Sequence, residues 1–148
     1  MSTAIVVCSR HHGNTRKLID AIKNAYPEIK VIDVTENKVA ELSKYDAIGV
    51  ASGIYASKFD SDLMEYLRDK LPSDKKVFAI YTYAMKMGHY AKDIKALVEE
   101  KHCKWIGEYG CQGYNTFGPF KLVGGTAKGH PTEDEIQRAV DFYSHLML

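Results

Sequence analysis

A run of small polar residues near the start of the chain carries groups that bind anions. Ser9 and Thr15 supply hydroxyl groups, and Asn14 supplies a side-chain amide. Gly13 allows a ligand to approach the backbone closely. A helix that begins here would leave its first N–H groups without an intrahelical partner, and its dipole favours negative charge. The residues predicted to bind a phosphate group are Ser9, Arg10, His11, His12, Gly13, Asn14 and Thr15.

The flanking sequence predicts the elements that hold these groups. Residues 4–8 form a short apolar run, typical of a strand buried on both faces. Apolar residues then recur at helical spacing, which predicts a helix over about residues 14–25 that ends before Pro27. A strand, a tight loop and a helix N-terminus in this order can bind a phosphate group. The alternative is that Asn14 and Thr15 only cap the helix.

The rest of the chain alternates between strand and helix patterns. Alternating strands and helices predict a parallel sheet with right-handed crossovers. Thr132 and Glu135 are predicted to form a capping box at the start of the last helix. Strands are predicted at 30–34, 47–51, 77–81 and from 105, and helices near 39–42, from about 60, over about 90–101 and after 132.

The spacing excludes three other anion-binding loops. The G-x-x-x-x-G-K-[ST] nucleotide-binding loop is absent. A low-molecular-weight tyrosine phosphatase has an arginine six residues after its cysteine, whereas Asn14 lies at that distance from Cys8. A response-regulator receiver has acidic residues at the end of its first strand, where this chain has Cys8 and Ser9. Cys8 is therefore interpreted as a buried strand residue rather than a nucleophile.

The motif Ser-x-x-x-Gly-Asn-Thr at residues 9–15, directly after an N-terminal strand, resembles the phosphate loop of flavodoxin-like proteins. The resemblance extends over nearly the whole chain. It implies an α/β fold in one domain over residues 1–148, a three-layer αβα arrangement with a doubly wound, five-stranded parallel sheet of order 2-1-3-4-5. It also implies bound flavin mononucleotide (FMN). The ligand would lie beyond the carboxyl ends of the strands, where the loops after strands one, three, four and five should meet.

The resemblance further implies that the loops after the third and fourth strands hold the flavin ring. Tyr55 could stack on the ring, or could pack with Ile54 onto the next helix. Tyr83 or Met85 could cover a face of the ring, or this segment could be an ordinary exposed loop. The residues predicted to contact the ring are Ser52, Gly53, Ile54, Tyr55, Ala56, Thr82, Tyr83, Ala84, Met85 and Gly113.

The stretch 110–131 is longer than a loop that only connects two elements needs to be. It holds six of the eleven glycines and two of the four prolines, which favours a functional or partner-binding loop.

Composition excludes several classes of protein. A net charge of +1 supports neither nucleic-acid binding nor a polybasic membrane interaction. No apolar run approaches membrane-spanning length, and no secretory leader is evident, so membrane insertion is not expected. The three cysteines lack metal-ligand spacing, which favours reduced thiols in a cytoplasmic protein without a metal site.

Together these features predict an FMN-binding electron-transfer protein, a monomer or weak homodimer, that serves redox partner proteins or a small flat redox substrate. Soluble carriers of the resembled family are usually acidic, and this chain is not. The alternative is an FMN-dependent NAD(P)H oxidoreductase acting on a quinone or porphyrinogen. Residues 52–55, followed by Lys58 and Phe59, also resemble flavodoxin-like protoporphyrinogen dehydrogenases. A third possibility is a cofactor-free interaction module that keeps only the fold.

Overall fold

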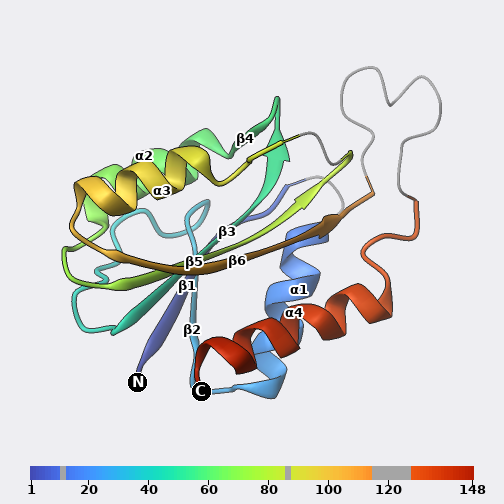
Figure 1. Cartoon of the computed structure of the whole chain (residues 1–148), viewed down its shortest axis with the longest axis horizontal. Helices are drawn as coiled ribbons and strands as arrows, with labels where there is room; N and C mark the ends of the chain where they lie inside the picture. Colours follow the sequence, from blue (N-terminus) through green and yellow to red (C-terminus); the bar gives the residue numbers. More distant parts are fainter. Residues whose placement is uncertain (11–12, 86–87, 115–127) are drawn as a thin grey trace.

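A computed structural model describes residues 1–10, 13–85, 88–114 and 128–148. His11, His12 and most of the predicted functional loop lie outside these residues, so those predictions stay open. The elements in chain order (Figure 1) are β1 (Thr3–Cys8), α1 (Asn14–Ala25), β2 (Lys30–Asp33), β3 (Ala47–Tyr55), β4 (Lys58–Phe59), α2 (Ser61–Lys70), β5 (Lys76–Tyr83), α3 (Lys92–Glu100), β6 (Lys104–Gln112) and α4 (Glu133–Leu146).

The sheet has the strand order β2-β1-β3-β5-β6, and every pairing along this path is parallel. This is the predicted doubly wound order, with one addition: the short strand β4 pairs antiparallel with the end of β3. The order reverses between β1 and β3, and a switch of this kind opens a crevice beyond the carboxyl ends of the two strands.

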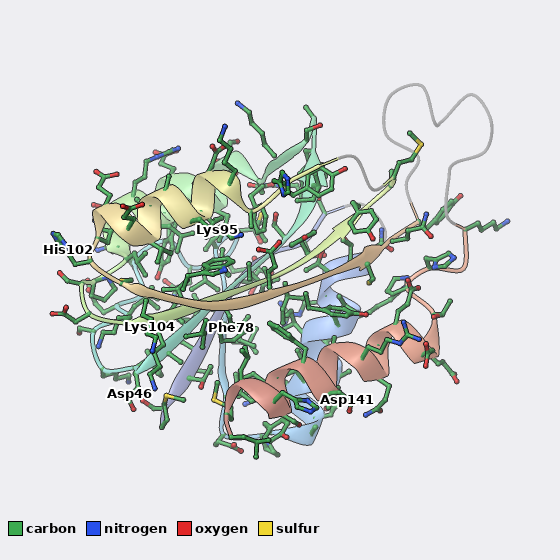
Figure 2. All side chains as sticks on the ribbon, in the orientation of Figure 1. Asp46, Phe78, Lys95, His102, Lys104 and Asp141 are labelled. Atoms are coloured by element: carbon green, nitrogen blue, oxygen red, sulfur yellow. The ribbon has the colours of Figure 1, made fainter. Side chains whose placement is uncertain are left out.

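Helices cover both faces of the sheet, with α2 and α3 on one side and α1 and α4 on the other (Figure 1). Strand β1 shows why the sequence demands this arrangement. Ala4 and Val6 pack into the core under α2 and α3, whereas Ile5 and Val7 pack into the core under α1 and α4. Phe78, on β5, fills the second core and lies on the α4 side of the sheet (Figure 2). An apolar strand therefore requires a helix layer on each face.

The predicted helix near residues 39–42 is wrong. The chain from 34 to 46 runs in turns and bends, with Leu42 buried in the core on the α2 and α3 side of the sheet and Val39 77% exposed. Side chains bind the backbone here instead of helical hydrogen bonds: the Tyr66 hydroxyl donates to the Ala40 carbonyl (2.7 Å) and Asn37 Oδ1 accepts from Val39 N–H (3.2 Å). Three apolar residues are too few to offset the cost of nucleating a helix.

The third strand is predicted to end at residue 51 and to be followed by a loop, but residues 52–58 form a β-hairpin instead. Strand β3 continues to Tyr55, which pairs with Lys58. The two residues at the tip, Ala56 and Ser57, have φ values of 50° and 64°. Two successive residues with positive φ form the type I′ turn that suits a right-handed twisted hairpin, but the turn strains residues other than glycine and asparagine.

We expect Ala56→Gly to stabilise the protein by about 1 kcal/mol, because glycine adopts positive φ without the Cβ clash. Chemical denaturation of the two proteins measures the change. Ala96→Gly on the exposed face of α3 is the matched control and should destabilise by about 1 kcal/mol. A loss of stability in Ala56→Gly would contradict the strained turn.

The last helix begins as predicted. The Thr132 side chain accepts a hydrogen bond from Glu135 N–H, and the Glu135 carboxylate accepts from Thr132 N–H, which completes the capping box. Cys8, Cys103 and Cys111 are free thiols, and Cys8 is fully buried as predicted. None of the helices in the described ranges is long and apolar enough to cross a membrane.

Candidate functional site

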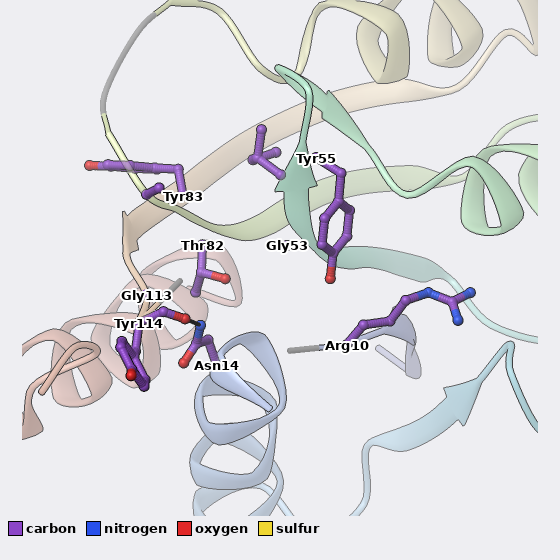
Figure 3. Close-up of a pocket in the computed structure, with 10 residues that line it drawn as sticks. Arg10, Asn14, Gly53, Tyr55, Thr82, Tyr83, Gly113 and Tyr114 are labelled. Atoms are coloured by element: carbon purple, nitrogen blue, oxygen red, sulfur yellow. Dashed lines mark hydrogen bonds between the residues drawn. The ribbon is translucent and has the colours of Figure 1, made fainter. Parts of the chain in front are cut away.

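Four loops meet at a pocket beyond the carboxyl ends of the strands (Figure 3). They follow β1, β3, β5 and β6, the four positions predicted from the order of elements. The residues that line the pocket are Arg10, Asn14, Gly53, Ile54, Tyr55, Thr82, Tyr83, Ala84, Gly113 and Tyr114.

The start of α1 forms one wall of the pocket, and its local structure leaves backbone donors free. Gly13, with φ 63° and ψ 30°, occupies the N-cap position and offers no side-chain cap. The first intrahelical bond runs from Lys17 N–H to the Gly13 carbonyl (3.1 Å), so the N–H groups of Asn14 and Thr15 have no acceptor within the helix. Ser9 Oγ accepts from Arg16 N–H (3.2 Å) and keeps its own proton to donate.

Charge distinguishes α1 from the other helices of the described chain. Helices α2, α3 and α4 each have an acidic residue in the first turn, which their dipoles favour, whereas α1 has none. The side chain of Arg16 is held outward by ion pairs with Asp20 and Asp33. The N-terminus of α1 is therefore left to bind an anion that is not part of the chain.

Asn14 joins the start of α1 to the end of β6. Its Nδ2 donates to the Tyr114 carbonyl (2.6 Å), while its Oδ1 is buried and has no hydrogen-bond partner among the described residues. A residue larger than glycine does not fit at position 113, because a Cβ atom there would lie 2.7 Å from Asn14 Nδ2. Asn14, a lining residue, therefore carries a buried acceptor that a ligand hydroxyl could satisfy.

Two tyrosines flank the upper part of the pocket (Figure 3). Tyr55 comes from the hairpin and its ring folds over Gly53, with its hydroxyl 3.0 Å from where a Gly53 Cβ would lie. Burial raises the pKa of Tyr55, while a hydrogen bond from the Arg10 backbone works in the opposite direction. Tyr83 is half-buried on the other side. Thr82 lies between the two tyrosines. A 2.8 Å hydrogen bond joins the Oγ1 atoms of Thr82 and Thr15 and fixes the Thr82 side chain.

A buried carboxylate, Asp60, connects the loop after β1 to the hairpin. Arg10 Nε donates to Asp60 Oδ2 (2.8 Å), and Arg10 also reaches Asp62 (2.7 Å). Asp60 Oδ1 caps α2 through the N–H groups of Asp62 and Leu63 (2.9 and 3.4 Å), and Asp60 N–H donates to Ser52 Oγ (3.1 Å). The Arg10 side chain therefore points toward the start of α2 rather than into the phosphate loop.

Ionisation in this network follows from burial and hydrogen bonding. Burial works against the charged form of Asp60, but hydrogen bonds from Arg10, Asp62 N–H and Cys8 outweigh it and lower the pKa of Asp60. Burial, followed by the charge of Asp60, raises the pKa of Cys8 to about 12. The Cys8 thiol is thus protonated at neutral pH, which agrees with its prediction as a structural strand residue.

The structure brings most of the predicted residues together and places others nearby. Ser9, Gly13 and Thr15 form the adjoining helix start, Ser52 is fully buried behind the hairpin, and Ala56 and Met85 are exposed beyond the pocket. Sequence reasoning missed Tyr114 as a lining residue and Asp60 as the link between two loops. Both roles arise from long-range contacts that no local pattern marks. Those of the predicted residues that line the pocket are Arg10, Asn14, Gly53, Ile54, Tyr55, Thr82, Tyr83, Ala84 and Gly113.

The geometry agrees with comparisons to known proteins. A family model described as a flavodoxin domain matches residues 5–108. The chain belongs to the flavodoxin family. An uncharacterized protein of Methanocaldococcus jannaschii is 33% identical to this flavodoxin-family chain over 150 residues, covering 99% of each. Membership implies a flavin cofactor, and flavodoxin-like proteins transfer electrons to partner proteins.

Solved flavodoxins share the fold of this family member at low sequence identity. A flavodoxin from the domain Archaea has a TM-score of 0.68 and 19% identity, with 99% of each chain covered. Oxidised flavodoxin 2 from Bacillus cereus has a TM-score of 0.71 and 16% identity, with 99% of this chain and 98% of that chain covered. Within the described residues, no cluster of three or more His, Cys, Asp or Glu side chains could hold a metal ion.

Proposed function

We propose that this protein binds one FMN in the pocket and transfers electrons through it. The observation that carries the proposal is the start of α1, the one described helix whose first turn has no acidic side chain, and whose first residue, Asn14, lines the pocket. A phosphate dianion suits such a helix end in both charge and hydrogen bonding.

Each part of FMN has a complementary group in the pocket. The Ser9 hydroxyl and the N–H groups of Asn14 and Thr15 would hold the phosphate. The buried Oδ1 of Asn14 can only accept hydrogen bonds and so would suit a ribityl hydroxyl better than a phosphate oxygen. The planar ring would lie near Tyr55 and Tyr83, where aromatic contact adds roughly 0.5–1.5 kcal/mol beyond the area buried.

Bound FMN supplies the redox chemistry, and the chain sets its environment. The pocket offers planar contact and hydrogen-bonding groups, and the Cys8 thiol at the end of β1 is protonated at neutral pH. This set of groups favours reversible electron transfer over covalent catalysis by the protein. The three free thiols support a place in the reducing cytoplasm.

The released cofactor tests the proposal most simply. Protein purified without added flavin, or incubated with FMN and desalted, should show flavin absorbance bands, and the released compound should have the mass of FMN. The holoprotein should accept electrons from a flavodoxin reductase and should not reduce quinones with NAD(P)H alone. Sustained quinone reduction without a reductase would favour the oxidoreductase alternative, and failure to bind any flavin would overturn both.

We expect the second reduction step of the bound flavin to occur at a less negative potential than in acidic flavodoxins. The ring loops at residues 52–59 and 82–89 contain no carboxylate, so they repel the anionic, fully reduced cofactor only weakly. Each tenfold change in relative affinity for the two redox forms shifts a one-electron couple by about 59 mV. Redox titration of the holoprotein measures this potential, and a value as low as that of the acidic carriers would contradict the expectation.

A further inference from the structure

A series of hydrogen bonds connects the start of α4 to the wall of the pocket. Glu135 Oε1 lies 2.5 Å from His130 Nδ1, and the His130 carbonyl accepts from Tyr114 N–H (3.0 Å). The Tyr114 carbonyl in turn accepts from Asn14 Nδ2 (2.6 Å; Figure 3). Asn14 and Tyr114 line the pocket, whereas His130 and Glu135 are not among its lining residues. The series therefore links two residues outside the pocket to two that line it.

The proton of the first bond belongs to His130. Burial works against the charged form of Glu135, but hydrogen bonds from Thr132 N–H and from His130 outweigh it and lower the pKa of Glu135. An ionised carboxylate can only accept, so His130 Nδ1 donates to Glu135 Oε1. A hydrogen bond to a charged acceptor is roughly twice as strong as a neutral one. This bond restrains the His130 side chain and, with it, the backbone at this position.

The cap of α4 does not need the bond from His130. The capping box is complete with Thr132 N–H donating to Glu135 Oε1 (2.8 Å) and Glu135 N–H donating to Thr132 Oγ1 (3.1 Å). Tyr109 ties the same turn to β6, because its hydroxyl donates to the Glu135 carbonyl (2.8 Å). His130 thus adds a contact to a helix start that is already fixed. What it adds is restraint on the backbone that meets Tyr114.

The orientation of the Asn14 amide depends on the last bond of the series. Rotation about χ2 of asparagine has no sharp preference, so hydrogen-bond partners decide where the two amide atoms lie. Because the Tyr114 carbonyl accepts from Nδ2, Oδ1 is the buried atom that has no partner among the described residues. A displaced Tyr114 would let the amide rotate. Oδ1 would then be ready for a ligand hydroxyl only part of the time.

We propose that His130 is a positioning residue for the cofactor: through Tyr114 it holds the Asn14 amide so that Oδ1 can accept from a ribityl hydroxyl. This inference rests on the proposed FMN site. It gives His130 no contact with the cofactor and no part in electron transfer. The effect should be selective for the ribityl chain, since other groups are proposed to hold the phosphate and the ring.

Three flavins separate this role from a general loosening of the pocket. FMN and riboflavin both carry the ribityl chain, whereas lumiflavin has a methyl group in its place. His130→Ala should weaken the binding of FMN and of riboflavin by about five- to tenfold, because the lost hydrogen bond to a charged group reaches the site only in part. Lumiflavin should bind equally to the variant and the wild type. Quenching of flavin fluorescence during titration measures these dissociation constants.

Two further variants control the experiment. His130→Asn is the rescue, because asparagine Nδ2 is as many bonds from Cα as histidine Nδ1 and can donate to Glu135. It should bind FMN within about twofold of the wild type. His145→Ala is the matched control, since His145 is an exposed histidine in the last turn of α4 whose Nδ1 lies 2.7 Å from the Asp141 carbonyl (Figure 2 labels Asp141). It should bind all three flavins as the wild type does.

Amide hydrogen exchange on the flavin-free protein tests the same link without the cofactor. Tyr114 N–H should exchange at least about fivefold faster in His130→Ala, because the carbonyl that accepts its bond is no longer restrained. The rate should be unchanged in His145→Ala. Urea denaturation of each variant checks that the protein is folded under the conditions of both experiments.

Several results would overturn the positioning role. Unchanged FMN binding in His130→Ala would do so, as would unchanged exchange at Tyr114. An equal loss for lumiflavin would show that His130 only stabilises the pocket as a whole. A loss in His130→Asn as large as that in His130→Ala would exclude the bond to Glu135 as the cause. Wild-type protein that binds none of the three flavins would instead overturn the proposed function, and the exchange rates would still decide whether His130 restrains Tyr114.

Discussion

Ser9→Asp should lower the affinity for FMN by roughly 100-fold, about 3 kcal/mol, because it places a carboxylate where the phosphate dianion is expected. The substitution keeps the local fold, since an aspartate oxygen can accept the hydrogen bond from Arg16 N–H as the serine oxygen does. Riboflavin has no phosphate, so its affinity should change little. Quenching of flavin fluorescence during titration measures both dissociation constants.

Ser9→Asn is the matched control for this experiment. Asparagine is similar in size to aspartate, has both a donor and an acceptor, and adds no charge. The affinity of the Ser9→Asn variant for FMN should therefore fall by no more than a few fold. Equal losses in the two variants would show that shape rather than charge determines the effect. Equal losses for FMN and riboflavin in Ser9→Asp would place the phosphate elsewhere.

Asp60→Ala should destabilise the protein by about 2–3 kcal/mol, because it removes a helix cap and leaves Arg10 without its buried partner. Arg10 is 44% exposed and can be solvated, which keeps the loss below that of a fully buried pair. Asp60→Asn retains the capping oxygen and should lose only about 1 kcal/mol. Urea denaturation at neutral pH separates these values, and equal stability of Asp60→Ala and wild type would contradict the role of this carboxylate.

The same carboxylate makes stability depend on pH. Because the pKa of Asp60 is lowered in the folded protein, its contribution is present above the unfolded-state pKa near 4 and is lost as pH falls through the folded-state value. The difference in unfolding free energy between wild type and Asp60→Asn should therefore be full at pH 7 and shrink below about pH 4. A difference that stays constant to pH 3 would exclude an ionised Asp60 as its source.

Local patterns predicted the elements that hold the phosphate site. The bounds of α1 and the parallel order of the sheet both follow from short-range signals, namely helical periodicity, a flanking proline and strands alternating with helices. These signals are strong because each depends on neighbouring residues only.

Other features could not be read locally. The hairpin turn uses Ala56 and Ser57, which lack the Asn-Gly signature of a type I′ turn. The bond from Asn14 to Tyr114 joins residues 100 positions apart, and the pair of Arg10 with Asp60 spans 50. Such contacts depend on the sheet bringing distant loops together. Sequence patterns could therefore predict where the pocket forms, but not how its walls are connected.

The ratio of the dissociation constants for riboflavin and FMN tests the central claim most directly. The two ligands differ only in the phosphate, which the start of α1 is proposed to bind through several charge-assisted hydrogen bonds. At about 1.5–3 kcal/mol for each such bond, FMN should bind at least about 100-fold more tightly to the wild-type protein. Equal affinities for the two ligands would contradict a phosphate site at the N-terminus of α1.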